Sequence, residues 1–196
     1  MDKDFKSIEK YAEEHNIPIM EKTGIKFLTK YIEENNVKSI LEIGSAIGYS
    51  AIKMALVNEN IKITTIEKDN VRYMEALKNI KDFGLEKRIT LIYGDALLLN
   101  IEDKYDLIFI DAAKGQYINF FEKYSKNLNK KGVIISDNID FHGLVNKEER
   151  IESKNLRQLV DKIRRYIDFL KENASFETTF YKVGDGVSIS RKREIN

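Results

Sequence analysis

Acidic and amide side chains close two successive apolar stretches of this sequence, and side chains of these types can hold a metal ion. Asp111 ends the stretch LIFID, and Asp137 and Asn138 end the stretch VIISDN. Two carboxylates and a carboxamide oxygen are hard ligands that suit Mg²⁺ or Mn²⁺ and leave coordination positions open for water or a substrate. One acid at a strand end is common and often only solvated, but the combination on successive stretches favours a metal site.

The segment LEIGSAIGYS, residues 41–50, predicts a tight turn from a strand into a helix. Gly44 and Gly48 remove side chains that would collide with a ligand lying over this turn. Their G-x-x-x-G spacing differs from the G-x-G-x-x-G spacing of diphosphate-binding turns, so it favours a nucleoside ligand without a diphosphate. Glu67 lies 23 positions after Gly44, where an acid can accept hydrogen bonds from ribose hydroxyls.

Two further residues follow apolar stretches in places where their side chains could contact a cofactor or lie near a metal. Asp95, in the motif YGDA, comes where a carboxylate and backbone groups could line an adenine pocket. Lys114 follows Asp111 by three residues at a predicted helix start, where its charge opposes the helix dipole. A lysine in that unfavourable place suits a role near the metal, and an exposed lysine without a function is the alternative interpretation.

The elements that must position these residues alternate between short apolar stretches and amphipathic segments. The stretches are nearly continuous in apolar residues, as in strands buried on both faces, and cover residues 39–44, 62–67, 89–94, 105–111 and 132–137. Helical spacing of apolar residues marks residues 49–57, 69–83 and 117–128 between them. This alternation predicts an α/β fold: a mostly parallel sheet with helices on both faces and its ligand site at the carboxyl ends of the strands.

The two ends of the chain have other patterns. Residues 4–15 and 22–35 have helical spacing and are separated by Pro18, the only proline. Residues 151–170 predict a long helix, and the segments ETTFYKV and GVSISRK around Gly184-Asp185 predict an antiparallel hairpin that closes the sheet. We therefore expect one domain over residues 1–196, with the helices of residues 1–36 packed on its core.

Composition narrows the functional classes further. The chain has 196 residues, of which 42% are hydrophobic and 33% charged, as in a globular protein. It has no cysteine, which excludes a disulfide framework, a thiolate zinc site and a cysteine nucleophile. The net charge of +1 means that a polyanionic partner must be held by a local basic patch. Without a signal-like or membrane-spanning apolar segment, the sequence predicts a cytoplasmic protein.

Taken together, the motifs resemble the cation-dependent S-adenosylmethionine O-methyltransferases of the catechol and caffeoyl-CoA type. The segments LEIGSAIGYSAIKMA, TTIEKD, YGDA, LIFIDAAKGQY and VIISDN match the motifs of this family in order, and VGDGVSISRK is similar to its closing hairpin. The likeness covers nearly the whole chain from Pro18 onward. It implies a Rossmann-like class I methyltransferase fold with a seven-stranded sheet whose last strand is antiparallel.

The resemblance also implies a role for each matching residue. Cofactor contacts would come from Met20, Gly44, Ser50, Glu67, Asp95, Ala96 and Asp111, with Glu67 on the ribose. Asp111, Asp137 and Asn138 would hold the metal, and Lys114 would be the general base. The metal would bind two vicinal oxygens of the acceptor and lower the pKa of its hydroxyl, Lys114 would remove the proton, and the oxyanion would attack the sulfonium methyl.

The acceptor must be inferred from weaker features. Ala113 stands where the animal catechol enzymes have a tryptophan, which predicts an open mouth and argues against a small catechol. The helix LRQLVDKIRRYIDFLKEN and the ending FETTFYKVGDG are similar to the bacterial branch that methylates 5-hydroxyuridine at the tRNA wobble position, where the 5-hydroxyl and 4-oxo groups offer vicinal oxygens. Basic residues in the last quarter of the chain predict either a rim that contacts phosphates or only a solvated helix face. They are Arg150, Lys154, Arg157, Arg164 and residues 191–193.

The resemblance thus implies a tRNA substrate and a homodimer, and three other functions stay open. A methyltransferase acting on catechol-like or phenolic molecules would keep the same cofactor and metal residues. An NAD-dependent dehydrogenase would use the glycine turn and Glu67, but would leave Asp137 and Asn138 unexplained. A non-catalytic RNA-binding module predicts that Asp111→Ala and Lys114→Ala change only the affinity for RNA.

Overall fold

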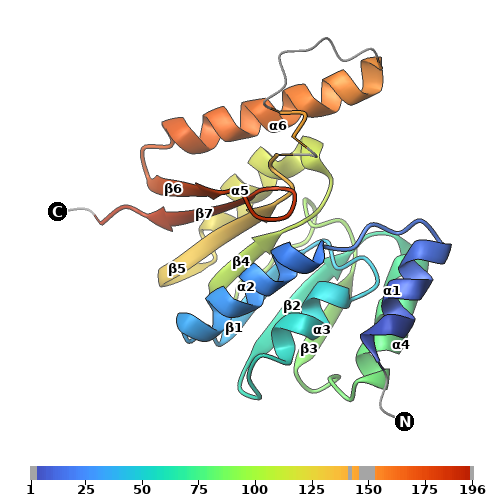
Figure 1. Ribbon diagram of the computed structural model, residues 1–196. Helices are drawn as coiled ribbons and strands as arrows, with labels where there is room; N and C mark the ends of the chain where they lie inside the picture. Colours follow the sequence, from blue (N-terminus) through green and yellow to red (C-terminus); the bar gives the residue numbers. More distant parts are fainter. Residues whose placement is uncertain (1–3, 141–142, 146–152, 195–196) are drawn as a thin grey trace.

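Seven strands form one sheet in the computed structural model, which describes residues 4–140, 143–145 and 153–194 (Figure 1). Their spatial order is β3-β2-β1-β4-β5-β7-β6. The strands are β1 (Ser39–Ile43), β2 (Lys62–Glu67), β3 (Ile89–Tyr93), β4 (Tyr105–Ile110), β5 (Leu128–Asp137), β6 (Phe176–Tyr181) and β7 (Val187–Lys192). Strands β1 to β5 pair in parallel, while β7 is antiparallel to both β5 and β6. The prediction of a mostly parallel seven-stranded sheet with an antiparallel last strand is confirmed.

Helices cover both faces of this sheet and enclose two apolar cores (Figure 1). The first core joins the sheet to α1 (Phe5–Glu14), α2 (Lys22–Glu34), α3 (Tyr49–Ala55) and α4 (Asn70–Asp82). The second core joins the other face to α5 (Tyr117–Ser125) and α6 (Lys154–Glu172). Residues of β1 and β4 are buried almost throughout, because side chains that point to either face meet a helix layer.

The N-terminal helices are part of the first core. Ile8 and Ala12 of α1 and Leu28 and Ile32 of α2 are buried in it. A side chain fixes the start of α1, because the Asp4 carboxylate accepts a hydrogen bond from the backbone N–H of Lys6 at 3.2 Å. Both helices, which lie within the described residues 4–36, thus pack on the sheet.

Two predicted boundaries differ from the structure. The helix expected over residues 117–128 ends at Ser125, and β5 already begins at Leu128, where it pairs with Tyr105. The chain leaves the helix there because the buried Asn127 side chain donates hydrogen bonds to backbone carbonyls of the β3–β4 connection. The long helix expected over residues 151–170 is α6, although Ile151 lies outside the described residues.

The expected hairpin is formed by β6 and β7, and its turn contains Gly184 and Asp185. Val187 of β7 pairs with Asp137, so the turn lies at the end of the sheet where the parallel strands finish. Along the described parts of the chain, no helix combines the length and apolar character needed to cross a membrane.

Candidate active site

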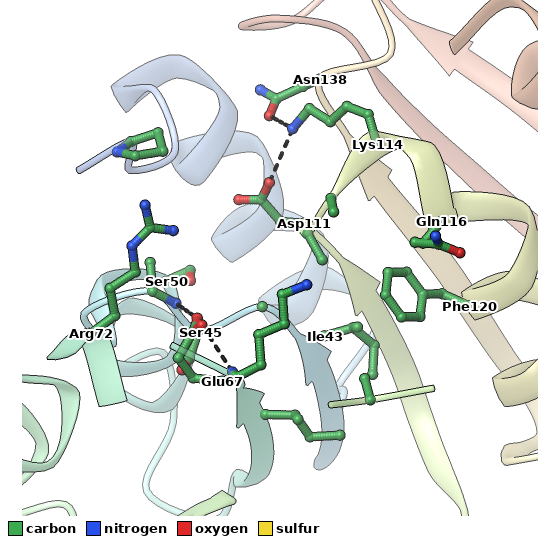
Figure 2. Close-up of a pocket in the computed structure, with 18 of the residues that line it drawn as sticks. Ile43, Ser45, Ser50, Glu67, Arg72, Asp111, Lys114, Gln116, Phe120 and Asn138 are labelled. Atoms are coloured by element: carbon green, nitrogen blue, oxygen red, sulfur yellow. Dashed lines mark hydrogen bonds and ion pairs between the residues drawn. The ribbon is translucent and has the colours of Figure 1, made fainter. Parts of the chain in front are cut away.

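A cavity of about 700 Å³ opens at the carboxyl ends of β1, β2 and β4 (Figure 2). This volume is typical of sites for ligands of cofactor size. Nearly all of the residues predicted from the sequence to bind cofactor, metal or proton line it, namely Met20, Gly44, Ser50, Glu67, Asp95, Ala96, Asp111, Lys114 and Asn138. Asp137 does not line the cavity. It is buried, and its charge and that of Asp111 act on each other.

The turn after β1 lies directly against the backbone of Asp111. Gly44 has a φ of +97°, and a Cβ at this position would overlap the carbonyl oxygen of Asp111 and lie 3.0 Å from its carbonyl carbon. We expected Gly44 to leave room for a ligand, but the group that excludes a side chain is the protein's own backbone. Glycine at position 44 therefore allows the turn after β1 to pack directly against the backbone of Asp111, a predicted metal ligand.

The carboxylate of Glu67 is held in place by three backbone N–H groups. Its Oε2 accepts from Ala46 at 2.9 Å, and its Oε1 accepts from Lys68 at 2.9 Å and from Asp69 at 2.8 Å. A carboxylate has about four acceptor positions, so one is left for a ligand hydroxyl. The bond to Ala46 also ties the glycine turn to the end of β2, and the arrangement suits the predicted ribose contact.

Glu42 is a buried acidic residue that contacts the predicted site and was not identified from the sequence. It is buried near the carboxyl end of β1 and accepts hydrogen bonds from the hydroxyls of Ser50 and Thr65. Burial raises the pKa of Glu42 from 4.5 to about 7, with smaller contributions from the charges of Asp111 and Glu67. Ser50, a predicted cofactor contact, is thus oriented by Glu42. A charged residue inside the apolar stretch SILEIG was the signal that could have identified it.

We expect Glu42→Gln to stabilise the protein at high pH. The raised pKa of Glu42 means that the folded state retains a proton between pH 4.5 and about 7 that the unfolded state loses, so the native protein loses stability as pH rises through this window. Glutamine has no charge to bury. The gain in free energy of unfolding should be near zero at pH 4.5 and reach roughly 3 kcal/mol at pH 8, since one pKa unit is worth about 1.4 kcal/mol.

Urea denaturation of both proteins at several pH values measures this difference. The exposed Glu59→Gln is the matched control for loss of a glutamate side chain and should not show the gain expected for Glu42→Gln at pH 8. An equal effect of Glu42→Gln at pH 5 and pH 8 would contradict the expectation.

The opposite wall of the cavity joins Lys114 to two of the predicted metal ligands (Figure 2). Lys114 belongs to a short helix, η1 (Lys114–Gln116), that begins just after β4. Its Nζ donates a hydrogen bond to Oδ1 of Asn138 and lies 3.6 Å from Oδ1 of Asp111. Asn138 has a φ of +55°, which is uncommon outside glycine but accessible to asparagine. The base and two metal ligands predicted from the sequence are therefore in direct contact.

The donor atoms at this wall fit a hard divalent cation. Burial raises the pKa of Asp111, and burial together with the charge of Asp111 raises the pKa of Asp137 to about 7. Two buried carboxylates that repel each other are stabilised by a cation between them. Within the described ranges, no three His, Cys, Asp or Glu side chains are grouped for metal binding, so a site here needs the amide oxygen of Asn138 to complete it.

The predicted basic rim is not one surface. Arg191 pairs with Val133, whereas Val187 pairs with Asp137, so residues 191–193 lie at the end of β7 that is remote from the cavity. The expectation that they share a rim with the long helix is wrong, because β7 runs opposite to the strands that carry the site. Arg150 lies outside the described residues.

Only part of α6 reaches the cavity. Leu159 lines the cavity. The exposed Lys162 lies close to Gly115, the residue after Lys114, because its Nζ is 3.1 Å from the position that a Cβ on Gly115 would take. Arg157 is exposed, and Nε of Arg164 donates to the Val145 carbonyl at 3.0 Å. Leu159 and Lys162 were not singled out from the sequence.

Comparisons with known proteins agree with this geometry. The family model described as O-methyltransferase matches residues 3–193. A caffeoyl-CoA O-methyltransferase of Populus kitakamiensis is 31% identical over 176 residues, which are 85% of this chain and 75% of that protein.

Two crystal structures share both fold and sequence with the chain. One, from Staphylococcus aureus and provisionally described as a caffeoyl-CoA O-methyltransferase, has a TM-score of 0.92 and 37% identity, covering 98% of this chain and 93% of that one. The other, an O-methyltransferase from Bacillus cereus in complex with SAH, has a TM-score of 0.81 and 25% identity over 98% and 93% of the two chains. The chain therefore belongs to the O-methyltransferase family, whose members transfer the methyl group of S-adenosylmethionine.

Proposed function

We propose that the protein is a Mg²⁺-dependent enzyme that methylates 5-hydroxyuridine at the wobble position of tRNA. The observation that carries the chemistry is the contact of Lys114 with Asp111 and Asn138 at the wall of the cofactor cavity. An amine that can accept a proton thus lies beside oxygen ligands for a cation, within reach of the same cavity. This combination suits an acceptor whose reacting hydroxyl has a second oxygen next to it.

Each group of residues has a defined task in this proposal. Glu67 holds the ribose, while Asp95 and Ala96 hold the base of the cofactor. Asp111, Asp137 and Asn138 would hold Mg²⁺, or Mn²⁺, which supplies positive charge that lowers the pKa of the acceptor hydroxyl. Lys114 accepts the hydroxyl proton at Nζ, and its contacts with Asp111 and Asn138 hold that atom beside the proposed metal ligands.

Features at the mouth of the cavity support an RNA acceptor. Ala113 lines the mouth with a small side chain, and the chain has no tryptophan to close over a small ring. Leu159 contributes an apolar wall on which an unstacked base can lie, and the charge of Lys162 is placed beside it to meet a phosphate. The 5-hydroxyl and 4-oxo groups of the uracil ring provide the adjacent oxygens.

A phenolic acceptor is the second candidate. The Populus kitakamiensis relative is named for caffeoyl-CoA. Such an acceptor also carries neighbouring oxygens on its ring, and its coenzyme A portion carries phosphates. The residues that would hold the metal and accept the proton are the same in either case, so the two candidates differ only outside the reacting centre.

Mass spectrometry of tRNA nucleosides from cells with and without the gene tests the proposal. Loss of the gene should remove 5-methoxyuridine-type nucleosides and cause 5-hydroxyuridine to accumulate. Purified enzyme should then methylate the tRNA from the deletion strain when S-adenosylmethionine and Mg²⁺ are added. Unchanged nucleosides, together with methylation of caffeoyl-CoA or catechol by the purified enzyme, would establish the phenolic alternative.

Methylation of tRNA by the purified enzyme also tests the role of α6. We expect Lys162→Gln to raise the KM for tRNA by about five-fold, as loss of one charged contact to phosphate is worth roughly 1 kcal/mol, and to leave the KM for catechol unchanged. Lys192→Gln is the matched control because it removes the same charge from the remote end of β7. Equal effects of the two variants would mean that α6 does not contact the substrate.

A further inference from the structure

The connection between β3 and β4 carries the residues proposed to bind the base of the cofactor. It spans residues 94–104, has no helix or strand, and places Gly94, Asp95, Ala96 and Leu97 in the cavity wall. A connection of this kind has no regular hydrogen-bond pattern of its own to keep its shape. Whatever fixes its backbone therefore also fixes the groups that meet the base.

Three side chains at the end of α5 and the start of β5 bind the carbonyl groups of this connection. The hydroxyl of Tyr124 donates to the Ala96 carbonyl at 2.6 Å, and Nζ of Lys123 donates to the Leu97 carbonyl at 2.6 Å. Nδ2 of Asn127 donates to the carbonyls of Ile101 at 2.7 Å and Asp103 at 2.8 Å. Four carbonyl groups of one connection are thus held from a single short segment, residues 123–127.

Two successive peptide groups next to the base site are held at both ends. In the group between Ala96 and Leu97, Tyr124 binds the carbonyl, and Oδ1 of Asp95 accepts from the N–H at 2.8 Å. In the next group, Lys123 binds the carbonyl of Leu97, and the N–H of Leu98 donates to the backbone carbonyl of Asp95 at 2.9 Å. Asp95 and Ala96 therefore cannot rotate without breaking bonds to α5.

The donors are suited to a fixed role. Tyr124 is 1% exposed, and burial raises its pKa to about 12, so the phenol keeps its proton throughout the working pH range. Lys123 is half-buried, and its head group reaches the carbonyl of Leu97. Neither residue lines the cavity, so both act on a ligand only through the connection.

We propose that Tyr124 and Lys123 are positioning residues that set the selectivity of the cofactor site for adenine, an inference that rests on the proposed roles of Asp95 and Ala96. Adenine presents an amino donor at position 6 and an acceptor at N1, which match a carboxylate and a backbone N–H. A 6-oxo purine reverses both groups and leaves them unpaired. Discrimination between the two bases requires Asp95 and Ala96 to be held in one orientation, because a mobile turn could adapt to either.

Binding of S-adenosylhomocysteine and S-inosylhomocysteine, measured by calorimetry, tests the proposal. We expect Tyr124→Phe to weaken S-adenosylhomocysteine about five- to ten-fold and S-inosylhomocysteine less than two-fold, so that the preference for adenine falls. Lys123→Met should act in the same direction. In steady-state assays the KM for S-adenosylmethionine should rise while kcat stays within two-fold, because Lys114 and its partners are untouched.

Tyr105→Phe is the matched control, since the buried Tyr105 hydroxyl donates to Thr64 in the sheet at 3.1 Å and not to the connection. It should leave both affinities unchanged. If Tyr124→Phe weakens both ligands equally, or neither, the positioning role is wrong. Asp95→Ala separates this failure from a failure of the site: unchanged binding of S-adenosylhomocysteine in that variant would overturn the assignment of Asp95, and with it the inference.

Discussion

Lys114→Met should lower kcat by about 10²- to 10⁴-fold while the Kd of S-adenosylhomocysteine stays within two-fold of the native value. The variant keeps a side chain of similar length but has no atom that can accept the acceptor proton. The proposed cofactor residues are spared because Glu67 ends β2 and Asp95 and Ala96 follow β3, whereas Lys114 follows β4. Single-turnover methyl transfer and calorimetry measure the two quantities separately.

Two further variants distinguish proton transfer from simple charge. Lys114→Arg keeps a positive charge near Asp111 and Asn138, but a guanidinium does not lose its proton, so this variant should be as inactive as Lys114→Met. Lys162→Met removes another lysine beside η1 and should leave kcat unchanged. Recovery of activity in Lys114→Arg, or a kcat within ten-fold of native in Lys114→Met, would show that Lys114 is not the base.

Gly44→Ala should destabilise the fold by roughly 3–5 kcal/mol and weaken binding of S-adenosylhomocysteine by at least ten-fold. The added Cβ would overlap the backbone of Asp111, and the φ of +97° is unfavourable for any side chain. Relief of the overlap requires the turn and the end of β4 to separate, which displaces residues of the proposed cofactor site and of the proposed metal site together. Urea denaturation and calorimetry at the same temperature measure both effects.

Gly84→Ala is the control for the conformational cost of a positive φ without a steric overlap. Gly84 has a φ of +65°, but a Cβ there would meet no atom within 4 Å. Only the conformational cost of about 1–2 kcal/mol should remain, and ligand binding should not change. If the two substitutions cost the same, contact with Asp111 does not constrain position 44.

The sequence was sufficient to predict the position of the site because parallel strands end at one edge. Apolar stretches that finish in Gly44, Glu67 and Asp111 leave few ways to arrange those residues, and all three line one cavity. The position of Asn138 follows from the same rule, since β5 neighbours β4. This rule predicts where these residues lie. It does not predict which hydrogen bonds and ion pairs their side chains form.

The missed and incorrect predictions have physical causes that local patterns do not contain. Glu42 binds Ser50 and Thr65 across elements, and nothing in the spacing of SILEIG indicates those partners. The basic residues 191–193 were grouped with α6 because charge was counted along the sequence, while the direction of β7 decides where they lie. Tyr124 lies within a segment of helical spacing, and its bond to Ala96 spans 28 positions of the chain, which local spacing does not indicate.

The three backbone hydrogen bonds to Glu67 cause its side chain to lose conformational entropy when the protein folds, before any ligand binds. A glutamate side chain that becomes immobile gives up conformational entropy worth about 1.5–2 kcal/mol. Here the carboxylate is immobilised by backbone groups of the turn after β1 and of the residues just before α4, so this entropy is lost during folding and little is left to lose on binding. The proposed ribose contact is therefore prepared in advance, and part of the affinity expected of the site for a nucleoside is already present in the free energy of the folded chain.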